Sequence, residues 1–211
     1  MSKKQKNSYL NILITAGATV EPIDPVRYIS NRSTGAMGLA IARAAKKRGH
    51  KIILIGPQAV LTARQMQKLV LKNFDKCDAV VMAAAVADYR PASAAIKKIK
   101  KSKEILNLKL IKNPDILAAL GKRKKDKILV GFALETEGLY KNALKKLKNK
   151  NLDFIAANQL TKKQNIFGEN KTSVLIIDKD GGKEYFNNVS KYKVAEKIIK
   201  RIEDLATYPS G

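Results

Sequence analysis

The sequence predicts an α/β fold: a doubly wound, mostly parallel sheet with an antiparallel hairpin at its C-terminal end. Short apolar runs suited to buried strands alternate with longer segments whose apolar residues recur at helical spacing. Near the C-terminus, two strand-like runs flank Asp180-Gly181-Gly182, a turn sequence typical of a hairpin. With 211 residues, 45% of them hydrophobic, the chain is long enough to bury a core. The predicted arrangement is therefore Rossmann-like.

The first strand-helix-strand unit carries a long polar loop at a ligand-binding position. Residues 9–14 form an apolar strand, a helix with an apolar face starts near Met37 and ends at Gly49, and residues 51–55 form the next strand. In open α/β sheets, ligands bind beyond the carboxyl ends of the strands. We therefore expect the loop of residues 15–38 to supply functional side chains.

The rest of the chain continues the alternation of helices and strands. The further predicted helices are 62–74, 116–122, 139–150 and 190–206, and the further predicted strands are 78–85, 106–110, 128–133, 153–158, 173–177 and 183–186. Leu106, Leu108 and Leu110 alternate with polar residues, which predicts a half-buried strand. Asp115 or Asn113 is suited to cap the helix that follows them.

We expect residues 9–206 to form a single domain after a disordered basic N-terminus at 1–8, with a flexible charged flap at about 92–104. No apolar segment is long enough for a signal peptide or a membrane span, which favours a cytoplasmic protein without membrane contacts. The single cysteine, Cys77, is expected to lie buried at the edge of the core. The single histidine, His50, is expected to be solvated. A chain with one cysteine and one histidine is not expected to form a Cys/His metal site.

The net charge of +24 has two interpretations. Lysines recur along predicted helix faces, which is typical of solvated surfaces. Alternatively, the charge serves a polyanionic ligand, either a small substrate or a nucleic acid. The chain has no zinc-finger spacing, RNP motif or GxxG-type clamp, and its aromatic content is only 6%. A nucleic-acid partner is therefore not expected, although a basic nucleic-acid-binding protein remains an alternative.

A second alternative is an NAD(P)-binding oxidoreductase, because Thr34-Gly35-Ala36-Met37-Gly38 is similar to a glycine-rich dinucleotide loop. Those glycines lie far beyond the first strand, whereas a dinucleotide fingerprint follows its strand directly. The second strand ends in Ile55-Gly56-Pro57-Gln58, without an acid for a ribose hydroxyl, and no Tyr-x-x-x-Lys pair occurs. One histidine also leaves a Ser/His/Asp or Cys/His system without a credible base.

Several motifs, taken together and in order, resemble the phosphopantothenate–cysteine ligase family, the second half of the bacterial bifunctional coenzyme A enzyme. The resemblance spans about residues 9–206, so the chain is either a stand-alone ligase or half of a bifunctional protein. The motifs are ITAGATVEPIDPVRYISNRSTGAMG (14–38), AAAVADYRP (83–91), KIKK (98–101), KNPDIL (112–117), VGFALETE (130–137), KLKNKNLDFIAAN (146–158) and IFG (166–168).

The resemblance implies a ligase that joins 4′-phosphopantothenate to L-cysteine. In this family the substrate carboxylate attacks the α-phosphate of CTP, or of ATP in eukaryotes, and cysteine then displaces the nucleotide from the acyl-nucleotide. The resemblance also implies a homodimer, and Mg²⁺ held by the triphosphate. Such chemistry relies on positioning and electrostatics rather than on a side-chain nucleophile, which agrees with the scarcity of histidine. The sequence leaves the choice between CTP and ATP open, with CTP expected.

The resemblance also assigns roles to individual residues. Asn31 is implied to hold the acyl-cytidylate for attack by cysteine, and Lys98 is implied to be a flap lysine that reaches the nucleotide phosphates. The remaining implied nucleotide contacts are Ala83, Ala84, Asp88, Asn113, Pro114, Asp115, Ile116, Phe132, Lys146 and Lys150. The substrate contacts are Arg27, Arg32 and Ser33, beside Asn31, and no metal ligand is implied. Glu21 and Asp24 are candidates to order the loop as partners of Arg27 or Arg32.

The sequence departs from the family pattern at four places. Ala36 stands where the family usually has lysine, and Leu134 replaces a usual alanine. Residues 169–172 lack an expected Asp and Asn. The connection from Pro57 to Thr62 is much shorter than usual, which predicts the loss of a loop and a short strand and puts the stability and the dimer in doubt.

Overall fold

A computed structural model describes residues 9–56, 62–101, 104–160 and 171–207. Five sequence predictions lie wholly or partly outside these ranges. They are the N-terminus at 1–8, the short connection at 57–61, part of the flap at 92–104, the IFG motif at 166–168 and part of the departure at 169–172. Within the described ranges, no helix has the length and apolar composition needed to cross a membrane.

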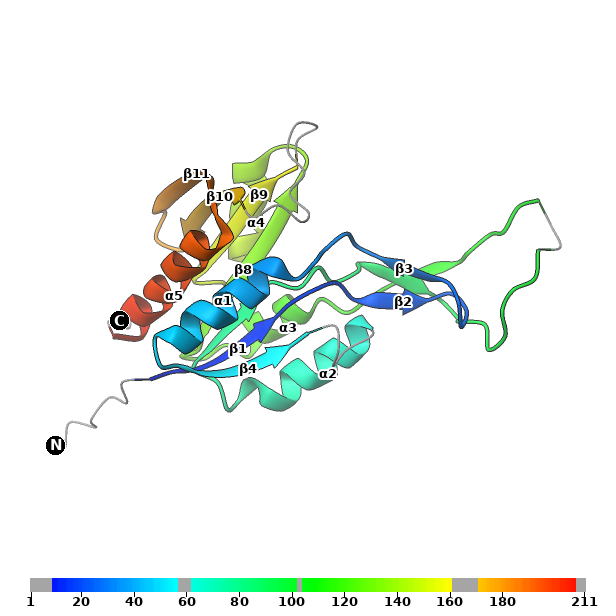
Figure 1. The fold of residues 1–211 in the computed structure, drawn as a ribbon, viewed down its shortest axis with the longest axis horizontal. Coiled ribbons are helices and arrows are strands. Elements are labelled where there is room, and N and C mark those ends of the chain that lie inside the picture. Colours follow the sequence, from blue (N-terminus) through cyan, green and yellow to red (C-terminus); the bar gives the residue numbers. More distant parts are fainter. Residues whose placement is uncertain (1–8, 57–61, 102–103, 161–170, 208–211) are drawn as a thin grey trace.

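The centre of the molecule is a seven-stranded sheet (Figure 1). Its strands, in spatial order, are β11 (Lys183–Ser190), β10 (Lys171–Asp178), β9 (Phe154–Gln159), β8 (Ile128–Glu135), β5 (Ala79–Met82), β1 (Asn11–Thr15) and β4 (Lys51–Ile55). The strands from β9 to β4 are parallel, whereas β10 runs antiparallel to both β9 and β11. This confirms the predicted mostly parallel sheet with its C-terminal hairpin.

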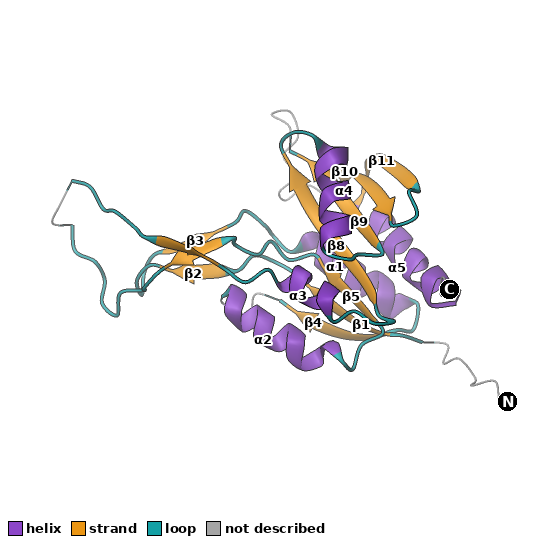
Figure 2. Cartoon of the chain, turned by 180° about the vertical axis from the view of Figure 1, so that it is seen from behind, coloured by secondary structure: helices purple, strands orange, loops and turns teal. Residues whose placement is uncertain are grey.

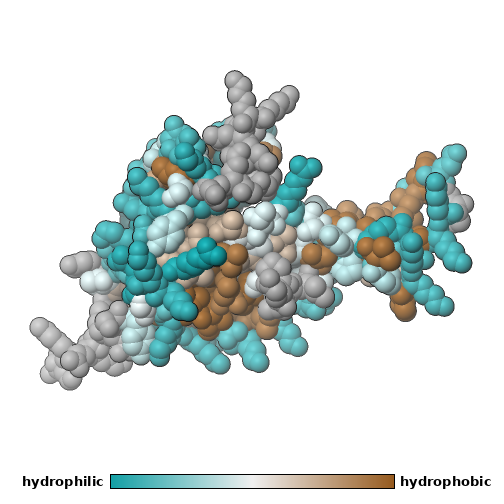
Figure 3. All heavy atoms as spheres, in the orientation of Figure 1, coloured by the Kyte–Doolittle hydropathy of each residue, from teal (hydrophilic) through white to brown (hydrophobic). Residues whose placement is uncertain are grey.

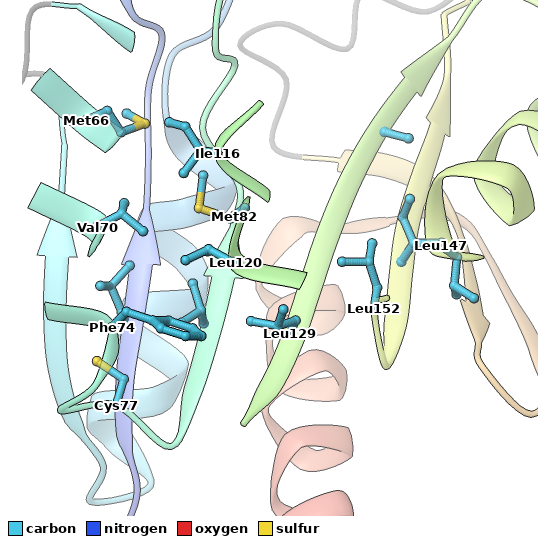
Figure 4. Packing of buried hydrophobic residues seen from close by; sticks show 14 of the residues in the cluster. Met66, Val70, Phe74, Cys77, Met82, Ile116, Leu120, Leu129, Leu147 and Leu152 are labelled. Carbon is cyan, nitrogen blue, oxygen red and sulfur yellow. The ribbon is translucent and has the colours of Figure 1, made fainter. Parts of the chain in front are cut away.

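Helices cover both faces of the sheet, because each strand points alternate apolar side chains to opposite sides. Leu13 of β1 belongs to a buried cluster with residues of α2 (Ala63–Phe74), α3 (Ile116–Lys122) and α4 (Leu139–Asn149). Figure 4 shows part of this cluster, including Phe74, Leu120 and Leu147. Ile12 and Ile14 pack instead with α1 (Ala36–Lys47) and α5 (Lys191–Thr207). The fold is therefore doubly wound. Cys77 is buried in the first cluster, as predicted.

Two small antiparallel ribbons form an arm that projects from the sheet (Figures 1 and 2). One ribbon pairs β2 (Val20–Pro22) with β3 (Tyr28–Ser30), and the other pairs β6 (Tyr89–Pro91) with β7 (Leu110–Lys112). We define the arm as residues 20–30 and the described part of 89–112. The Ala95 N–H donates to the Ile23 carbonyl at 2.9 Å, which ties the flap segment to the first ribbon.

The predicted half-buried strand at 106–110 is wrong. Only the last of those residues belongs to a strand, β7, and Leu106 and Leu108 precede it outside any regular element. Leu106, Leu108 and Leu110 are all exposed, Leu106 to 53%. An alternating pattern predicts a buried face only where another layer covers it, and the arm projects away from the sheet and its helices.

The predicted solvation of His50 is also wrong, because its ring is buried between β1, β4 and α5. Its Nδ1 accepts a hydrogen bond from the Leu10 N–H at 3.2 Å, and its Nε2 lies 2.9 Å from Glu203 Oε1. Gly49 does end the helix with a positive φ of 84°, as predicted. That turn directs His50 under α5, and its partner Glu203 is too distant in sequence for local pattern reasoning to find.

Candidate functional site

A cavity of about 820 Å³ opens at the carboxyl ends of β5 and β8. It lies beside the reversal of strand order, where β1 is followed along the chain by β4 on one side and by β5 on the other. Ligands of doubly wound sheets bind at such switch points. The walls of this main cavity are Asn31, Arg32, Met82, Ala84, Ala85, Val86, Ala87, Asp88, Asn113, Pro114, Asp115, Ile116, Leu117, Phe132, Ala133, Leu134, Lys146, Lys150 and Leu160.

A second cavity of about 200 Å³ adjoins the main one at the N-terminus of α1. Arg32 and Leu134 line both cavities. The residues that line only the second cavity are Ser33, Thr34, Gly35, Ala36, Met37, Ala83, Asn158, Thr172 and Lys191. Two adjoining spaces are suited to one extended ligand or to two reacting ligands.

Buried threonines hold the loops after β1 and β5 side by side. Thr15 Oγ1 accepts a hydrogen bond from the Ala84 N–H at 3.1 Å, and Thr19 Oγ1 accepts one from the Ala87 N–H at 2.9 Å. The same arrangement fixes the side chain of Asn31, because its Nδ2 donates to the Val86 carbonyl in the loop after β5 at 3.1 Å. The loop of residues 15–38 thus brings Asn31 to the cavity wall, as predicted.

Glycines let α1 approach β1 closely. A Cβ added to Gly38 would lie 2.6 Å from the Ala16 Cβ and 2.8 Å from the Thr15 carbonyl oxygen. Gly35, the residue before α1, has a positive φ of 75° and carries no side chain that could cap the helix. Thr34 Oγ1 accepts a hydrogen bond from the Ala36 N–H at 3.4 Å, and the positive end of the helix dipole lies at the second cavity, which favours an anionic ligand there. These glycines serve helix packing and do not form the loop of a dinucleotide fingerprint.

The N-terminus of α3 forms another wall of the main cavity. Asp115 caps this helix, since its Oδ1 accepts from the Ala118 N–H at 3.0 Å. This confirms one of the two predicted caps. Asn113 instead donates from Nδ2 to the Ala87 carbonyl at 2.8 Å, which joins α3 to the loop after β5. Partial burial raises the pKa of Asp115, but the hydrogen bonds from Ala118 and Lys150 outweigh it and leave that pKa below its usual value.

Two lysines, Lys146 of α4 and Lys150 directly after it, line the main cavity, and each is paired with a carboxylate. Lys146 Nζ lies 2.7 Å from Glu135 Oε1, at the end of β8. Lys150 Nζ lies 2.9 Å from Asp115 Oδ2. The two lysines lie one helical turn apart and face the same side. Both ammonium groups are thus held at the wall of the cavity by neighbouring side chains.

The structure brings most of the predicted site residues together. The predicted residues on the main cavity are Asn31, Arg32, Ala84, Asp88, Asn113, Pro114, Asp115, Ile116, Phe132, Lys146 and Lys150. Ala83 and Ser33 line the second cavity. Leu134, one of the departures from the family pattern, lies on both walls and is 43% exposed. The sequence analysis missed the walls formed by Met82, Val86, Leu117 and Leu160, which carry no chemical signature.

Lys98 and Arg27 do not line either cavity. Lys98 is exposed on the arm. Arg27 donates to both Asp24 and the Ile99 carbonyl, the latter at 2.8 Å. The hydrogen bond from the Arg27 side chain outweighs the effect of burial and, with backbone donors, holds the pKa of Asp24 far below its usual range. Asp24 therefore orders the arm as a partner of Arg27, one of the two arginines considered for this contact.

Glu21 does not pair with either arginine. Its side chain is buried, and its Oε1 accepts a hydrogen bond from the Ala63 N–H at 2.9 Å. It thus satisfies a free donor at the start of α2 and fastens the base of the arm to that helix. The predicted arginine partner is wrong, because the fold brings the start of α2 to this carboxylate.

A doubly wound sheet with polar cavities at its switch point defines a Rossmann-like α/β protein, and the cavities lie where such folds bind small ligands. A family model described as "DNA/pantothenate metabolism flavoprotein C-terminal domain" matches residues 8–205. The chain belongs to this family.

Two curated relatives illustrate the similarity. The chain is 41% identical over 209 residues to the coenzyme A biosynthesis bifunctional protein CoaBC of Bacillus subtilis, covering 93% of this chain and 52% of the relative. It is 42% identical over 205 residues to a cysteine/cysteine sulfinic acid decarboxylase of an unknown prokaryotic organism, covering 90% of this chain and 57% of the relative. The chain thus spans about half the length of these relatives.

Solved structures are similar over nearly the whole chain. The C-terminal domain of a CoaBC protein has a TM-score of 0.77 and 35% identity, covering 96% of this chain and 99% of that domain. A mutant of Cab2 in complex with phosphopantothenate-cysteine has a TM-score of 0.66 over 93% of this chain and 87% of its own. Its identity is 18%, so this second likeness concerns the fold alone.

Proposed function

We propose that this protein is a ligase of coenzyme A biosynthesis that joins 4′-phosphopantothenate to L-cysteine, using CTP through an acyl-cytidylate. The observation that carries the proposal is the pair of adjoining cavities with Asn31 and Arg32 on their walls. Membership of the pantothenate-metabolism family and the similarity to CoaBC support it. The cavities provide room for a nucleotide and an anionic substrate next to each other.

The main cavity suits the nucleotide. Phe132 and small alanines offer an apolar wall for a base, while Lys146 and Lys150 offer two ammonium groups for phosphates. Mg²⁺ would arrive with the triphosphate and take most of its ligands from phosphate oxygens and water. Asp88 would be available as one further ligand for Mg²⁺. It lines the cavity and makes no ion pair with any residue in the described part of the chain.

The second cavity suits the phosphate of 4′-phosphopantothenate. The N-terminus of α1 lines this cavity and favours an anion through the helix dipole, and Arg32 and Ser33 add side-chain donors. Ala36 occupies the first turn of this helix, so the backbone and Arg32 would supply the attraction that a lysine usually adds there. From this anchor, the substrate carboxylate would extend toward the nucleotide in the main cavity.

The reaction would proceed in two steps. The carboxylate oxygen of 4′-phosphopantothenate attacks the α-phosphorus of CTP, and the bond to pyrophosphate breaks. The cysteine amine then attacks the acyl carbon, the bond to CMP breaks, and the amine loses its proton to solvent. Asn31 holds one amide donor on Val86, so its Oδ1 and second N–H stay available for the amine and the acyl oxygen. The lysines stabilise charge that develops on the phosphates.

We also propose a homodimer that forms through the arm. Its exposed apolar side chains include Val26, Tyr28, Ile96 and Ile105, which are 59%, 62%, 93% and 71% exposed. Figure 3 shows hydrophobic residues gathered on this projection. Apolar side chains at such density on a narrow projection are typical of an interface. Lys98 lies on the same arm, so its predicted contact with phosphates requires either movement of the arm or the arm of a second copy.

An assay of pyrophosphate release tests the proposed function. Purified protein with Mg²⁺, 4′-phosphopantothenate and cysteine is supplied with CTP or ATP in parallel reactions, each lacking one component in turn. We expect release with CTP, and formation of the amide only when cysteine is present. Absence of pyrophosphate with both nucleotides would refute the ligase. Release with ATP alone would refute the CTP preference but retain the reaction.

A further inference from the structure

Glu135 lies directly beyond the wall of the main cavity. It is the last residue of β8, whose preceding residues Phe132 and Leu134 form that wall. Its backbone is fixed by the sheet, since it is in register with Gln159 of β9 and its carbonyl accepts from the Leu160 N–H at 2.8 Å. The backbone from which the carboxylate extends is therefore fixed by the central sheet.

Both carboxylate oxygens of Glu135 are held by side chains of α4. Oε1 accepts from Lys146 Nζ at 2.7 Å, and Oε2 accepts from Asn142 Nδ2 at 3.2 Å. Asn142 also donates to the Glu137 carbonyl at 3.0 Å, which fixes the orientation of its amide. The Glu135 side chain is only 13% exposed, whereas that of Lys146 is 43% exposed. The carboxylate is thus the fixed partner and the lysine is the one that reaches into the cavity.

We propose that Glu135 is the positioning residue that aims the Lys146 ammonium group at the nucleotide phosphates before the nucleotide binds. This inference rests on the proposed use of a nucleotide in the main cavity. A lysine side chain has several rotatable bonds, so an unrestrained ammonium group would lose conformational freedom on binding a phosphate. Glu135 removes that freedom in advance.

The carboxylate does not have to leave when a phosphate binds. An ammonium group has three N–H donors, and Glu135 occupies one of them in this geometry. Two donors stay available for phosphate oxygens. The alternative, that Glu135 competes with the nucleotide for Lys146, predicts tighter nucleotide binding once the carboxylate is removed. The two roles therefore predict changes of opposite sign.

The test compares Glu135→Gln with Glu137→Gln in steady-state ligase assays. Glu137 is exposed in the loop that follows β8 and makes no ion pair in the part of the chain that the structure describes, so it is a matched control. We expect Glu135→Gln to raise the KM for CTP about tenfold, because one charge-assisted hydrogen bond is lost. The kcat and the KM for 4′-phosphopantothenate should stay within about twofold. Glu137→Gln should leave all three constants unchanged.

A double-mutant cycle separates positioning from a general structural role. In a Lys146→Met background, Glu135→Gln should cause no further rise in the KM for CTP, because the carboxylate acts only through that lysine. Additive losses, a fall in KM, or a parallel loss of thermal stability that accounts for the change would overturn the inference. Absence of turnover by the unmodified protein would instead refute the proposed function, before any variant is compared.

Discussion

Asn31 reaches the cavity wall because its amide donates to the Val86 carbonyl, which lies in the loop after β5. This contact joins the two loops that follow neighbouring strands, so the side chain is held in place before any ligand binds. Fixed donors beside a reacting carbonyl stabilise the charge that develops there. At the scale of single residues, the amide of Asn31 is therefore the group on which amide formation should depend most.

We predict that Asn31→Asp permits formation of the acyl-nucleotide but slows its reaction with cysteine by about 10²-fold. The variant keeps the size of the side chain and replaces the amide donor by a negative charge. Rapid-quench measurement of pyrophosphate and of the amide product separates the two steps. Asn188→Asp, on the exposed strand β11, should leave both steps unchanged. Equal slowing of both steps would contradict the assigned role.

At the scale of elements, α1, α5 and the start of β1 are joined by a cluster around Glu203. Its carboxylate accepts from Arg48 Nε at 2.8 Å and lies 2.9 Å from His50 Nε2. The hydrogen bond from Arg48 outweighs partial burial and, together with that of His50, lowers the pKa of Glu203 from its ordinary value. The ionised form thus stabilises the folded protein.

The lowered pKa gives the sign of a pH dependence. The contribution is fully present above the ordinary pKa of 4.5 and is lost as the pH falls through the folded-state value. We predict that Glu203→Gln lowers the free energy of unfolding by about 1–2 kcal/mol at pH 7, and by progressively less below pH 4.5. Urea unfolding across this pH range measures the difference.

A neighbouring carboxylate supplies the control for this prediction. Asp204 is 60% exposed and lies 3.4 Å from Lys200, one turn away on α5. Asp204→Asn should change stability by less than about 0.5 kcal/mol, as expected of an exposed ion pair. A difference for Glu203→Gln that stays constant from pH 7 to pH 3 would show that packing, rather than charge, is responsible.

At the scale of the whole molecule, the arm is the part that projects away from the packed sheet and helices (Figure 1). Asp24 and Arg27 fasten its two segments through Ile99, and Glu21 joins its base to α2. Its apolar side chains nevertheless face solvent in the single chain. An interface between two copies would bury them and would also bring two of the candidate sites into one assembly.

We predict that the protein is a dimer in solution and that Ile96→Asp with Ile105→Asp makes it a monomer. A charge at each exposed isoleucine would have to be buried on association, which should raise the dimer Kd at least about tenfold. Light scattering coupled to size-exclusion chromatography measures the mass. Tyr185→Asp, 62% exposed on β11, should leave the mass unchanged. A monomeric unmodified protein would refute the dimer.

The sequence by itself determined the order and type of nearly all elements of the sheet, because buried strands and amphipathic helices follow from local apolar periodicity. The predicted cap at Asp115 is confirmed for the same local reason. These features depend on residues close together in the chain. The site residues were predicted instead from motifs that resemble those of a family, and the fold brings Asn31, Asp115 and Lys146 to one cavity.

Only the tertiary structure decided the features that depend on contacts distant in sequence. It buried His50 against Glu203 and exposed the leucines of 106–110 on the arm. It also paired the Glu21 carboxylate with the start of α2 rather than with an arginine. It also placed Lys98 outside the cavity and Glu135 behind Lys146. A local pattern specifies which faces of an element are apolar, but which partner covers each face is set by the packing of the whole chain.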